Sequence, residues 1–387
     1  MSFSIHALAA ARRIFAARGI FAGALMGAAL LLGGSTVPAG AAPVTLTDIA
    51  DRAVTLPAPA RRIVLAEGRQ IIALALLDHD PVALLAGWSA DLKRRDPDTY
   101  ALVEAKFPQV AAVPTVGEGS EDSFSVERTL SIKPDLVVLS GRLGTTQPEQ
   151  MLAQFEAAGV PVVFVDFFAH PFKNTVPSLR ILGQAIGRED AAAAYIDFYE
   201  SHMKRIADRL AVPGITRPKV LMEAHAGGTG ECCNAPGRGS IGDFITFAGG
   251  HNIAADVIPG THGRLSLEFV LTQDPQIYVA TGGPHLKGTG GLVLGPSVTP
   301  EQARQSLASV VRRPGIADIA AVRAGNAHGL FHNLVNLPLN VLVAEALARW
   351  IHPDLFADVD PAATLTEINT RYLAVPFTGV YWIDLKP

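Results

Sequence analysis

Short runs of apolar residues alternate along this chain with longer segments in which apolar positions recur every three or four residues. The short runs predict strands buried on both faces, and the longer segments predict helices that cover those strands. Strands that alternate with helices imply a largely parallel sheet. In the first half we expect two short strands within 44–56, further strands at 63–65, 81–88, 136–139 and 160–167, and helices at 69–77, 148–158, 176–187 and immediately before Lys133.

Residues 188–212 contain neither Gly nor Pro, begin with acids after Arg188, and end with Lys204, Arg205 and Arg209. This order of charges complements the dipole of a helix, which would be about 35 Å long. After it the alternation resumes, with strands expected at 218–226, 276–283 and near 327–331, and helices at 240–250, 266–275 and 337–356.

The sequence therefore predicts an α/β fold of two Rossmann-like lobes joined by one long α-helix. The expected boundaries are 43–187 for the N-terminal lobe, 188–212 for the linker helix and 213–387 for the C-terminal lobe.

Residues 1–42 have the pattern of a secretory signal peptide: Arg12, Arg13 and Arg18, no acid, an apolar run over 19–34, and a small-residue end. We expect cleavage near Ala41 or Ala42, and a free protein in the periplasm. A membrane anchor is the alternative, but the apolar run is short for a spanning helix. The arginine pair also resembles a twin-arginine signal, so the export route, Sec or Tat, stays open. No cysteine lies near the cleavage site, which excludes lipid attachment there.

Removal of the signal's three arginines takes the formal charge from −4 to −7, which disfavours nucleic acid or an anionic membrane as a partner. The remaining chain of roughly 345 residues exceeds what one core usually serves, so two lobes are expected. Two cysteines can form only one disulfide, so a fold of this size must be stabilised by packing and not by a disulfide framework. No strand is followed by a dinucleotide-binding or phosphate-loop motif, and no Gly-x-Ser-x-Gly elbow is present.

Several sequence segments, taken in their order along the chain, resemble segments of the periplasmic substrate-binding proteins of ABC importers that carry iron-siderophore complexes, haem and cobalamin. They are VTLTDIADRAVTLPAPARRIV, LSIKPDLVVLSG, FEAAGVPVVFVDF, ITFAGGHNIA, SLEFVLTQDPQIYVATGG and ALARWIHPDLF, and they span nearly the whole mature chain. The resemblance implies the class III fold, with a rigid helix between the lobes, a ligand in the cleft and modest closure. It implies a monomeric, non-enzymatic protein that docks on an inner-membrane permease through one acid per lobe, here Glu67 or Glu118 and Asp243.

In open α/β sheets a ligand lies at the carboxyl ends of the strands, so residues that follow the strands are the candidates for binding it. They mix cations, aromatics and imidazoles, which suits a bulky, anionic ferric siderophore, carried as cargo and not as an intrinsic cofactor. Three of the candidates have alternative roles. Arg69 could pair with Glu67 at the surface, and Trp88 could pack in the core. Arg264 could be a solvated loop residue. The candidates are Arg69, Trp88, Arg142, His170, His225, Cys232, Cys233, Arg238, Arg264, His285, Lys287 and His332.

Cys232 and Cys233 are adjacent in GGTGECCNAPGRG, a segment whose glycines argue against helix and strand. In an oxidising compartment with no other partner, they should form a vicinal disulfide. Such a pair would make a rigid apolar plate facing the cleft. A purely structural clip, metal ligation and redox chemistry are the alternatives.

Other cargoes and one other class of function stay open. Cobalamin, haem or an oxyanion such as molybdate fits the same class of protein, and haem would call for an axial ligand such as His332 or Tyr381. A bare metal ion would need convergence of histidines such as His225, His262, His285 and His332, but no pair has close ligand spacing. A secreted enzyme using the cysteines is disfavoured because catalytic dithiols are generally spaced Cys-x-x-Cys.

Overall fold

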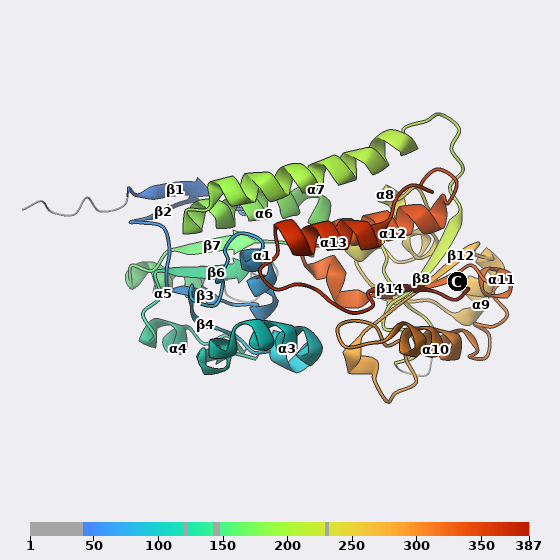
Figure 1. Ribbon diagram of the computed structural model, residues 1–387, viewed down its shortest axis with the longest axis horizontal. Helices are drawn as coiled ribbons and strands as arrows, with labels where there is room; N and C mark the ends of the chain where they lie inside the picture. The colour runs from blue at the N-terminus through green and yellow to red at the C-terminus, as the bar shows by residue number, and fades with distance from the viewer. Residues whose placement is uncertain (1–41, 119–122, 142–147, 229–231, 387) are drawn as a thin grey trace, which may run out of the picture. The chain divides into compact units, whose positions relative to one another are not determined.

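Two five-stranded sheets, separated in the chain by one long helix, form the framework of the protein (Figure 1). The computed structural model describes residues 42–118, 123–141, 148–228 and 232–386. Nearly all of the expected signal peptide, and also Arg142, lie outside the described residues. Within the described part of the chain, no helix combines the length and the apolar character needed to cross a membrane.

The first sheet has the order β5-β4-β3-β6-β7, and all neighbouring strands are parallel. Successive residues of a strand point to opposite faces. Ile63 and Leu65 accordingly join one hydrophobic cluster, whereas Val64 joins a second cluster with Phe155 and Leu130. Helices thus cover both faces, as a continuous apolar strand requires. The elements are β1 (Val44–Thr47), β2 (Ala53–Leu56), β3 (Ile63–Leu65), η1 (Gly68–Gln70), α1 (Ile71–Ala75), β4 (Leu85–Ser89), α2 (Asp91–Arg95), α3 (Pro97–Lys106), η2 (Pro108–Ala112), β5 (Thr115–Gly117), α4 (Val126–Ser131), β6 (Leu136–Ser140), α5 (Pro148–Ala157), β7 (Val162–Val165) and α6 (Pro171–Ile186).

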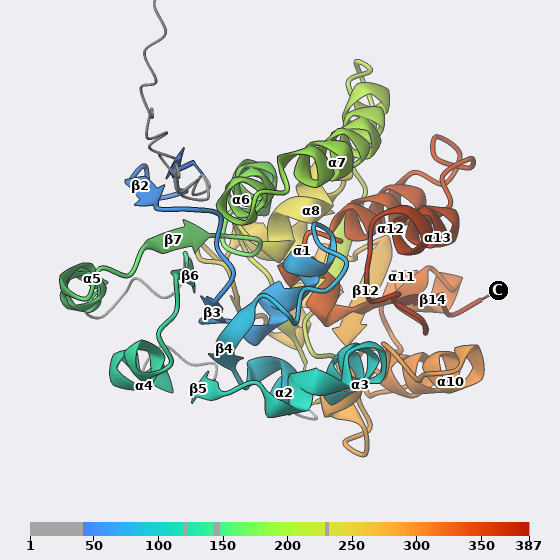
Figure 2. The ribbon, with the colours of Figure 1, turned by 60° about the vertical axis from the view of Figure 1, so that its left-hand side comes forward.

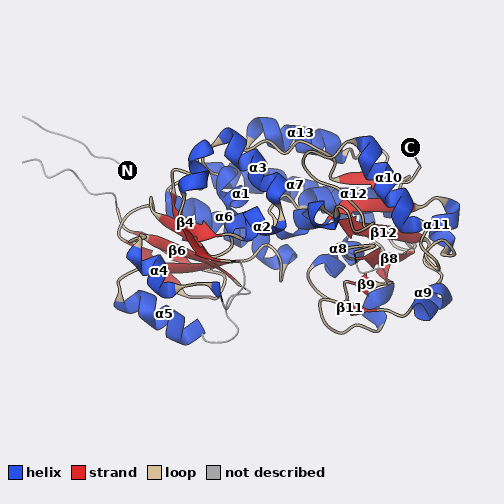
Figure 3. Cartoon of the chain, turned by 90° about the horizontal axis from the view of Figure 1, so that it is seen from below, coloured by secondary structure: helices blue, strands red, loops and turns tan. Residues whose placement is uncertain are grey.

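The second sheet has the order β10-β8-β12-β13-β14, parallel except for β14, which runs antiparallel to β13. Helices lie around its strands as they do around those of the first sheet (Figure 3). A separate two-stranded ribbon, β9 with β11, joins the end of β8 through a hydrogen bond from the Ala224 amide to the Asn234 carbonyl oxygen at 2.7 Å. The elements are β8 (Lys219–Glu223), β9 (Asn234–Ala235), α8 (Ile241–Phe247), β10 (His251–Asn252), η4 (Ile253–Asp256), β11 (Gly263–Arg264), α9 (Leu267–Gln273), β12 (Ile277–Gly282), η5 (Pro284–Leu286), α10 (Pro300–Val311), α11 (Ala320–Ala324), β13 (Ala327–Phe331), η6 (His332–Asn336), α12 (Val341–Ile351), α13 (Pro361–Arg371) and β14 (Trp382–Asp384).

The long helix α7 (Glu189–Leu210) connects the two sheets without a break and lies beside α6 and α12 (Figures 1 and 2). Its buried face is aromatic and aliphatic. Tyr195 donates a hydrogen bond to the carbonyl oxygen of Pro338 at 2.8 Å, and Tyr199 donates to Asn340 Oδ1 at 2.8 Å. Arg205 pairs with the buried Glu345 at 2.7 Å. These contacts fix the helix to the second lobe, while its packing on α6 fixes it to the first.

The α/β fold with two lobes and one linking helix is confirmed; the exact domain boundaries stay a prediction. The strand expected at 81–88 begins only at Leu85, because a turn occupies the preceding residues, where Asp80 accepts a hydrogen bond from the Ala83 amide at 3.2 Å. The expectation that the cysteine segment holds no strand is wrong, since Asn234 pairs with Arg264 in the ribbon of β9 and β11. The sequence interpretation also missed the helices α2, α3, α10, α11 and α13 and the strands β5, β10, β11 and β14.

Candidate ligand-binding site

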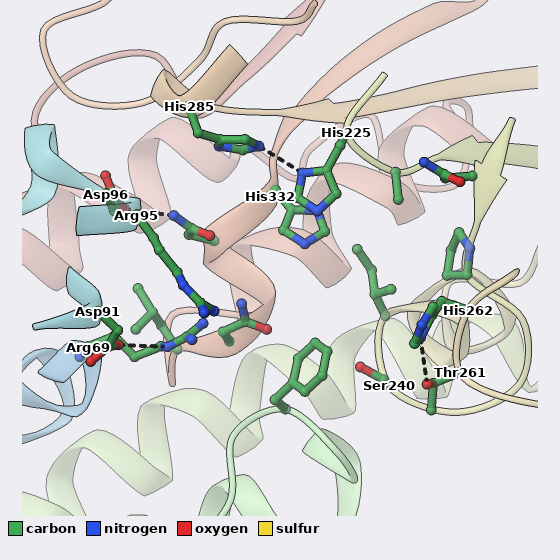
Figure 4. A pocket seen from close by; sticks show the side chains of 18 of the residues that line it. Arg69, Asp91, Arg95, Asp96, His225, Ser240, Thr261, His262, His285 and His332 are labelled. Atoms are coloured by element: carbon green, nitrogen blue, oxygen red, sulfur yellow. Dashed lines mark hydrogen bonds and ion pairs between the residues drawn. The ribbon is translucent and has the colours of Figure 1, made fainter. Parts of the chain in front are cut away.

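A pocket of about 1030 Å³ is lined by residues from both lobes. The first lobe contributes η1, the α2–α3 junction and the residues after β7, and the second contributes the ends of β8 and β13, the β9–β11 ribbon and η6. In Figure 4, Arg69 and Arg95 enter from one side, three histidines lie along another, and Ser240, Thr261 and His262 face the arginines across the space. The pocket is large enough for a ligand of several hundred daltons.

Arg69 is held at the pocket wall by carboxylates. Asp91 accepts hydrogen bonds from the amides of Gly68 at 2.6 Å and Arg69 at 3.4 Å, and its Oδ2 lies 3.5 Å from Arg69 Nε. Glu67 Oε2 lies 3.9 Å from the same nitrogen. Position 68 requires glycine, because a Cβ there would come within 2.4 Å of the Ser89 carbonyl oxygen. The turn therefore places a guanidinium in the pocket with its orientation set by neighbouring acids.

Two further arginines lie in the last turn of helix α2, where a positive charge interacts favourably with the helix dipole. Arg94 is exposed and pairs with Glu118 at 2.5 Å. Arg95 is also exposed, lines the pocket, and has no hydrogen-bond or ion-pair partner among the described residues. A side chain of this kind is free to bind an anionic ligand.

Asp96 links the two lobes at the edge of the pocket. Its carboxylate caps α3 by accepting from the Thr99 amide and hydroxyl, and it also accepts from Asn333 Nδ2 of the second lobe at 2.9 Å. Burial raises the pKa of the Asp96 carboxyl above its usual value, although the hydrogen bonds from Asn333 and Thr99 act in the opposite direction. The contact ties the first-lobe wall directly to η6.

Three histidines from neighbouring strands of the second sheet meet at the pocket (Figure 4). His225 Nδ1 lies 2.8 Å from His285 Nε2, which is hydrogen-bond distance. The His225 ring is tilted against that of His332, with 4.0 Å between their centroids. His332 Nδ1 lies 2.9 Å from Thr281 Oγ1. Strands β8, β12 and β13 are adjacent and parallel, so their carboxyl ends bring these side chains to one edge.

The surroundings of the pocket lower the pKa of all three imidazoles, although His225 and His285 keep part of their surface exposed. Burial and the neighbouring His285 lower the pKa of His225 to about 4. Burial, the other two imidazoles and the Arg69 guanidinium lower the pKa of His332 well below its usual value. Burial also lowers the pKa of His285, while the Asp96 carboxylate partly offsets this effect. A neutral imidazole has a lone pair on one ring nitrogen, and this is the form of histidine that binds metals.

These pKa shifts predict a pH-dependent stability. The unfolded chain takes up protons on its histidines near pH 6.5, whereas in the folded protein the pKa of His225 is about 4 and those of His285 and His332 are also lowered. The free energy of unfolding of the ligand-free protein should therefore be at its full value above about pH 6.5 and decline as the pH falls toward 4. Melting temperatures between about pH 7.5 and 4.5 measure this slope. His332→Asn should flatten it, and the exposed His79→Asn should not; equal slopes in all three proteins would contradict the assignment.

Of the remaining candidates among the described residues, Arg264 alone lines the pocket, from β11. Trp88 is buried in the core, with its ring 6.0 Å from that of Tyr100. The exposed Arg238 donates to the Ala255 carbonyl oxygen at 2.9 Å, outside the pocket lining. Two more exposed candidates, His170 and Lys287, also lie outside the pocket lining, and Arg142 is not among the described residues.

The cysteine pair sits behind the pocket wall. Cys232 is paired with Cys233, which is fully buried, and neither residue lines the pocket. The segment directly after them does, through Asn234, Ala235 and Pro236. Cys233 and Leu265 exchange backbone hydrogen bonds, so the pair anchors the start of the β9–β11 ribbon.

The acids expected to dock on a permease are placed differently in the two lobes. Glu67 is half-buried beside Arg69, whereas Glu118 is exposed and pairs with Arg94. Asp243 is half-buried in the first turn of α8 and accepts a hydrogen bond from the Gly239 amide at 2.9 Å. This hydrogen bond gives Asp243 a local structural role, because it stabilises the start of helix α8.

Sequence reasoning missed much of the polar lining: Asp91, Arg94, Arg95, Asp96, Ser240, Asn333 and Asn336. The available signal for four of them was DLKRRDP, a basic helix end followed by an Asp-Pro start. Among the described residues, no group of three or more His, Cys, Asp or Glu side chains is arranged to hold a metal ion.

Comparisons with known proteins agree with this geometry. The profile of a family described as "Periplasmic binding protein" matches residues 74–330. A curated relative from Halobacterium salinarum, named "Cobalamin-binding protein", is 28% identical over 310 residues, covering 79% of this chain and 73% of the relative. The crystal structure of a TroA-like periplasmic binding protein, FepB, from Veillonella parvula superposes with a TM-score of 0.83 at 28% identity, covering 89% of this chain and 100% of that one. A periplasmic heme binding protein from Pseudomonas aeruginosa, at 22% identity and a TM-score of 0.53, covers 76% of this chain and 93% of its own and supports the fold alone.

Proposed function

The chain belongs to the periplasmic binding protein family, the substrate-binding components of ABC importers, and from that premise we propose that it binds a ferric siderophore between its lobes and delivers it to an inner-membrane permease. Proteins of this family bind their substrates and are not enzymes. One observation carries the proposal: a single pocket presents the guanidinium groups of Arg69 and Arg95 on one side and neutral imidazoles on the other.

The arginines account for the charge of the cargo. Ferric siderophores present carboxylate, hydroxamate or catecholate oxygens, and a guanidinium can bind such oxygens with two parallel hydrogen bonds. Arg95 is available for this role because no described residue pairs with it, and Arg69 is held in place by Asp91. Arg264 contributes a third guanidinium from the opposite lobe.

The imidazoles account for the metal and the organic shell. Neutral His225 or His332 can donate a lone pair to a metal position that the chelator leaves open, or pack its ring against the ligand. Phe168 adds an apolar surface from the first lobe. A pocket of about 1030 Å³ is large enough for a ligand of several hundred daltons together with water.

A corrinoid is the second candidate, and a specific observation favours it. The Halobacterium salinarum relative that covers 79% of this chain is named for cobalamin binding. A neutral imidazole is also a suitable ligand for cobalt. The arginines favour the siderophore over the corrinoid, since a corrinoid offers fewer anionic oxygens.

Absorbance and thermal shift test the proposal together. Mature protein purified from its native host should carry a visible charge-transfer band of a ferric chelate; corrin bands would select the second candidate, and a Soret band would select haem. Ligand-free protein should melt at a higher temperature with ferric enterobactin, in proportion to RT ln(1 + [L]/Kd), about 2.7 kcal/mol at a hundredfold excess over Kd. Absence of a shift with every chelate would refute the binding role.

The remaining parts of the proposal concern export and docking. The basic and apolar pattern of 1–42 supports export to the periplasm with cleavage near Ala41 or Ala42. We propose Asp243 and Glu67 as the acids that meet the permease, with the protein acting as a monomer. Glu67 also supports Arg69, so its replacement would change the pocket as well as the docking surface.

We also propose that Cys232 and Cys233 form a disulfide in the exported protein. Because the ring closes between neighbours, it restricts the unfolded chain very little. The double variant Cys232→Ser/Cys233→Ser should therefore lose stability mainly through polar groups in the buried site of Cys233, while chelate affinity changes little. Alkylation without reductant, followed by mass spectrometry, tests the disulfide. A large loss of affinity with unchanged stability would mean that the sulfurs reach the ligand.

A further inference from the structure

Unpartnered polar atoms concentrate at the pocket. Among the described residues, nine buried side-chain nitrogen or oxygen atoms have no hydrogen-bond partner. Three of the nine belong to residues that line this one pocket: Arg69 Nε, Ser240 Oγ and Asn336 Oδ1. Buried polar groups are nearly always hydrogen-bonded, because an unmade bond is costly. A cluster of exceptions around one cavity indicates partners that a ligand provides.

Ser240 is 1% exposed and stands immediately before helix α8. A serine at this position usually caps the helix with its hydroxyl. Here it does not, because its backbone, at φ 50° and ψ −128°, is not in the capping conformation, and Asp243 instead bonds the nearby Gly239 amide. The local structure thus leaves the Ser240 hydroxyl unused at the pocket wall (Figure 4).

Asn336 ends η6, the short helix that also carries His332 and Asn333. Its side chain is buried, at 8% exposure, and no described residue hydrogen-bonds to its carboxamide. Other asparagines nearby are satisfied: Asn333 donates to Asp96, and Asn340 bonds Tyr199 and Thr175. Asn336 is therefore the exception among its neighbours, and it lines the pocket.

The three atoms differ in what they require of a ligand. Arg69 Nε can only donate; Asp91 and Glu67 face it as ion-pair partners at 3.5 and 3.9 Å but form no hydrogen bond with it, so a ligand oxygen can still accept from it. Asn336 Oδ1 can only accept, so it needs an N–H or O–H group. Ser240 can do either. A ligand that satisfies the set must carry donors and acceptors together on its organic framework, and an amide group provides both.

We propose that the pocket selects metal chelates that carry amide groups, and that Ser240 and Asn336 are residues that determine this specificity; the inference rests on the proposed function. Haem does not meet the requirement, because its edge carries methyl and vinyl groups and ionised propionates, which supply no outward N–H or O–H donor. Catecholate siderophores with amide links and corrinoids with amide side chains both meet it.

Affinity measurements on two variants test the inference with three probes: ferric enterobactin and cyanocobalamin, which carry amides, and haemin, which does not. Ser240→Ala and Asn336→Leu should each weaken binding of the better amide-bearing probe by about tenfold. Ser309→Ala, which removes an exposed helix hydroxyl outside the pocket, is the matched control and should bind as wild type. Whichever amide-bearing probe binds with the higher affinity shows whether the pocket prefers a catecholate siderophore or a corrinoid.

A second readout separates recognition from a structural role. Because Ser240 Oγ and Asn336 Oδ1 have no partner in the described part of the protein, their removal should leave the ligand-free melting temperature unchanged or raise it. Unchanged affinity of both variants for the amide probes would overturn the inference, as would haemin binding as tightly as either amide probe. Failure of all three probes to bind wild-type protein would instead refute the proposed function.

Discussion

Replacing Arg69 by glutamine is expected to weaken binding of an anionic ferric chelate by about 10- to 100-fold, the size of a lost charge-assisted hydrogen bond. Its guanidinium lies in the pocket at 18% side-chain exposure, where water screens it little. The variant also leaves Asp91 with only backbone partners, and this acid then repels the ligand. Both effects lower affinity in the same direction.

Titration calorimetry with ferric enterobactin measures the loss. Arg312→Gln is the matched control, because Arg312 is exposed and, within the described ranges, its side chain hydrogen-bonds to Ser309 alone, at 3.4 Å. Added salt should reduce the affinity of the wild type more than that of Arg69→Gln, since one charge contact has been removed. Equal affinity of Arg69→Gln and the wild type would mean that the chelate does not reach this arginine.

Glu223→Gln should destabilise the protein by about 3–5 kcal/mol, the typical effect of breaking a buried ion pair. Glu223 is 1% exposed at the end of β8. It accepts two hydrogen bonds from Arg313, at 3.0 and 2.5 Å, and one from the Tyr278 hydroxyl at 2.5 Å. The glutamine would leave the Arg313 charge without its counterion in a desolvated site.

Urea denaturation followed by circular dichroism measures the change in the free energy of unfolding. Glu301→Gln, at an exposed pair with Arg304, should change it by less than about 1 kcal/mol. The double variant Glu223→Met/Arg313→Met should recover part of the loss, since no charge is left unpaired. A loss as small as that of Glu301→Gln would show that the network contributes little. Because His225 follows β8 closely, chelate affinity should fall with stability in the single variant.

The sequence predicts the framework well where the local signal is strong. Continuous apolar runs mark β3, β6, β7 and β12, and the charge order over 188–212 marks α7. The weak points are helices without a clear apolar stripe. Helix α3 is the example: PDTYALVEAK has few apolar residues at helical spacing, and only the capping Asp96 and Pro97 announce it. With α3 missed, the arginines at the end of α2 were missed as well.

The rule that ligands lie at strand ends selects some residues that line the pocket and others that do not, for a geometric reason. His225, His285 and His332 follow three adjacent parallel strands and reach the same edge. Trp88 is at the end of a strand too, but its side chain points into the core, because alternate residues face opposite sides. The sequence locates the edge, whereas side-chain direction depends on strand bounds that are uncertain by a residue or two. Ser240 and Asn336 lie outside every strand and carry no motif at all.

The firm attachment of α7 to both lobes has an energetic consequence for ligand capture. A protein that must rearrange before it can hold a molecule loses part of the interaction energy to that rearrangement. Tyr195 and Tyr199 hydrogen-bond helix α7 to the second lobe, and its packing on α6 joins it to the first. Asn333 also donates to Asp96 at the edge of the pocket, between the two lobes. Most of what each contact contributes should therefore be retained as affinity, and small differences between competing molecules should translate directly into discrimination.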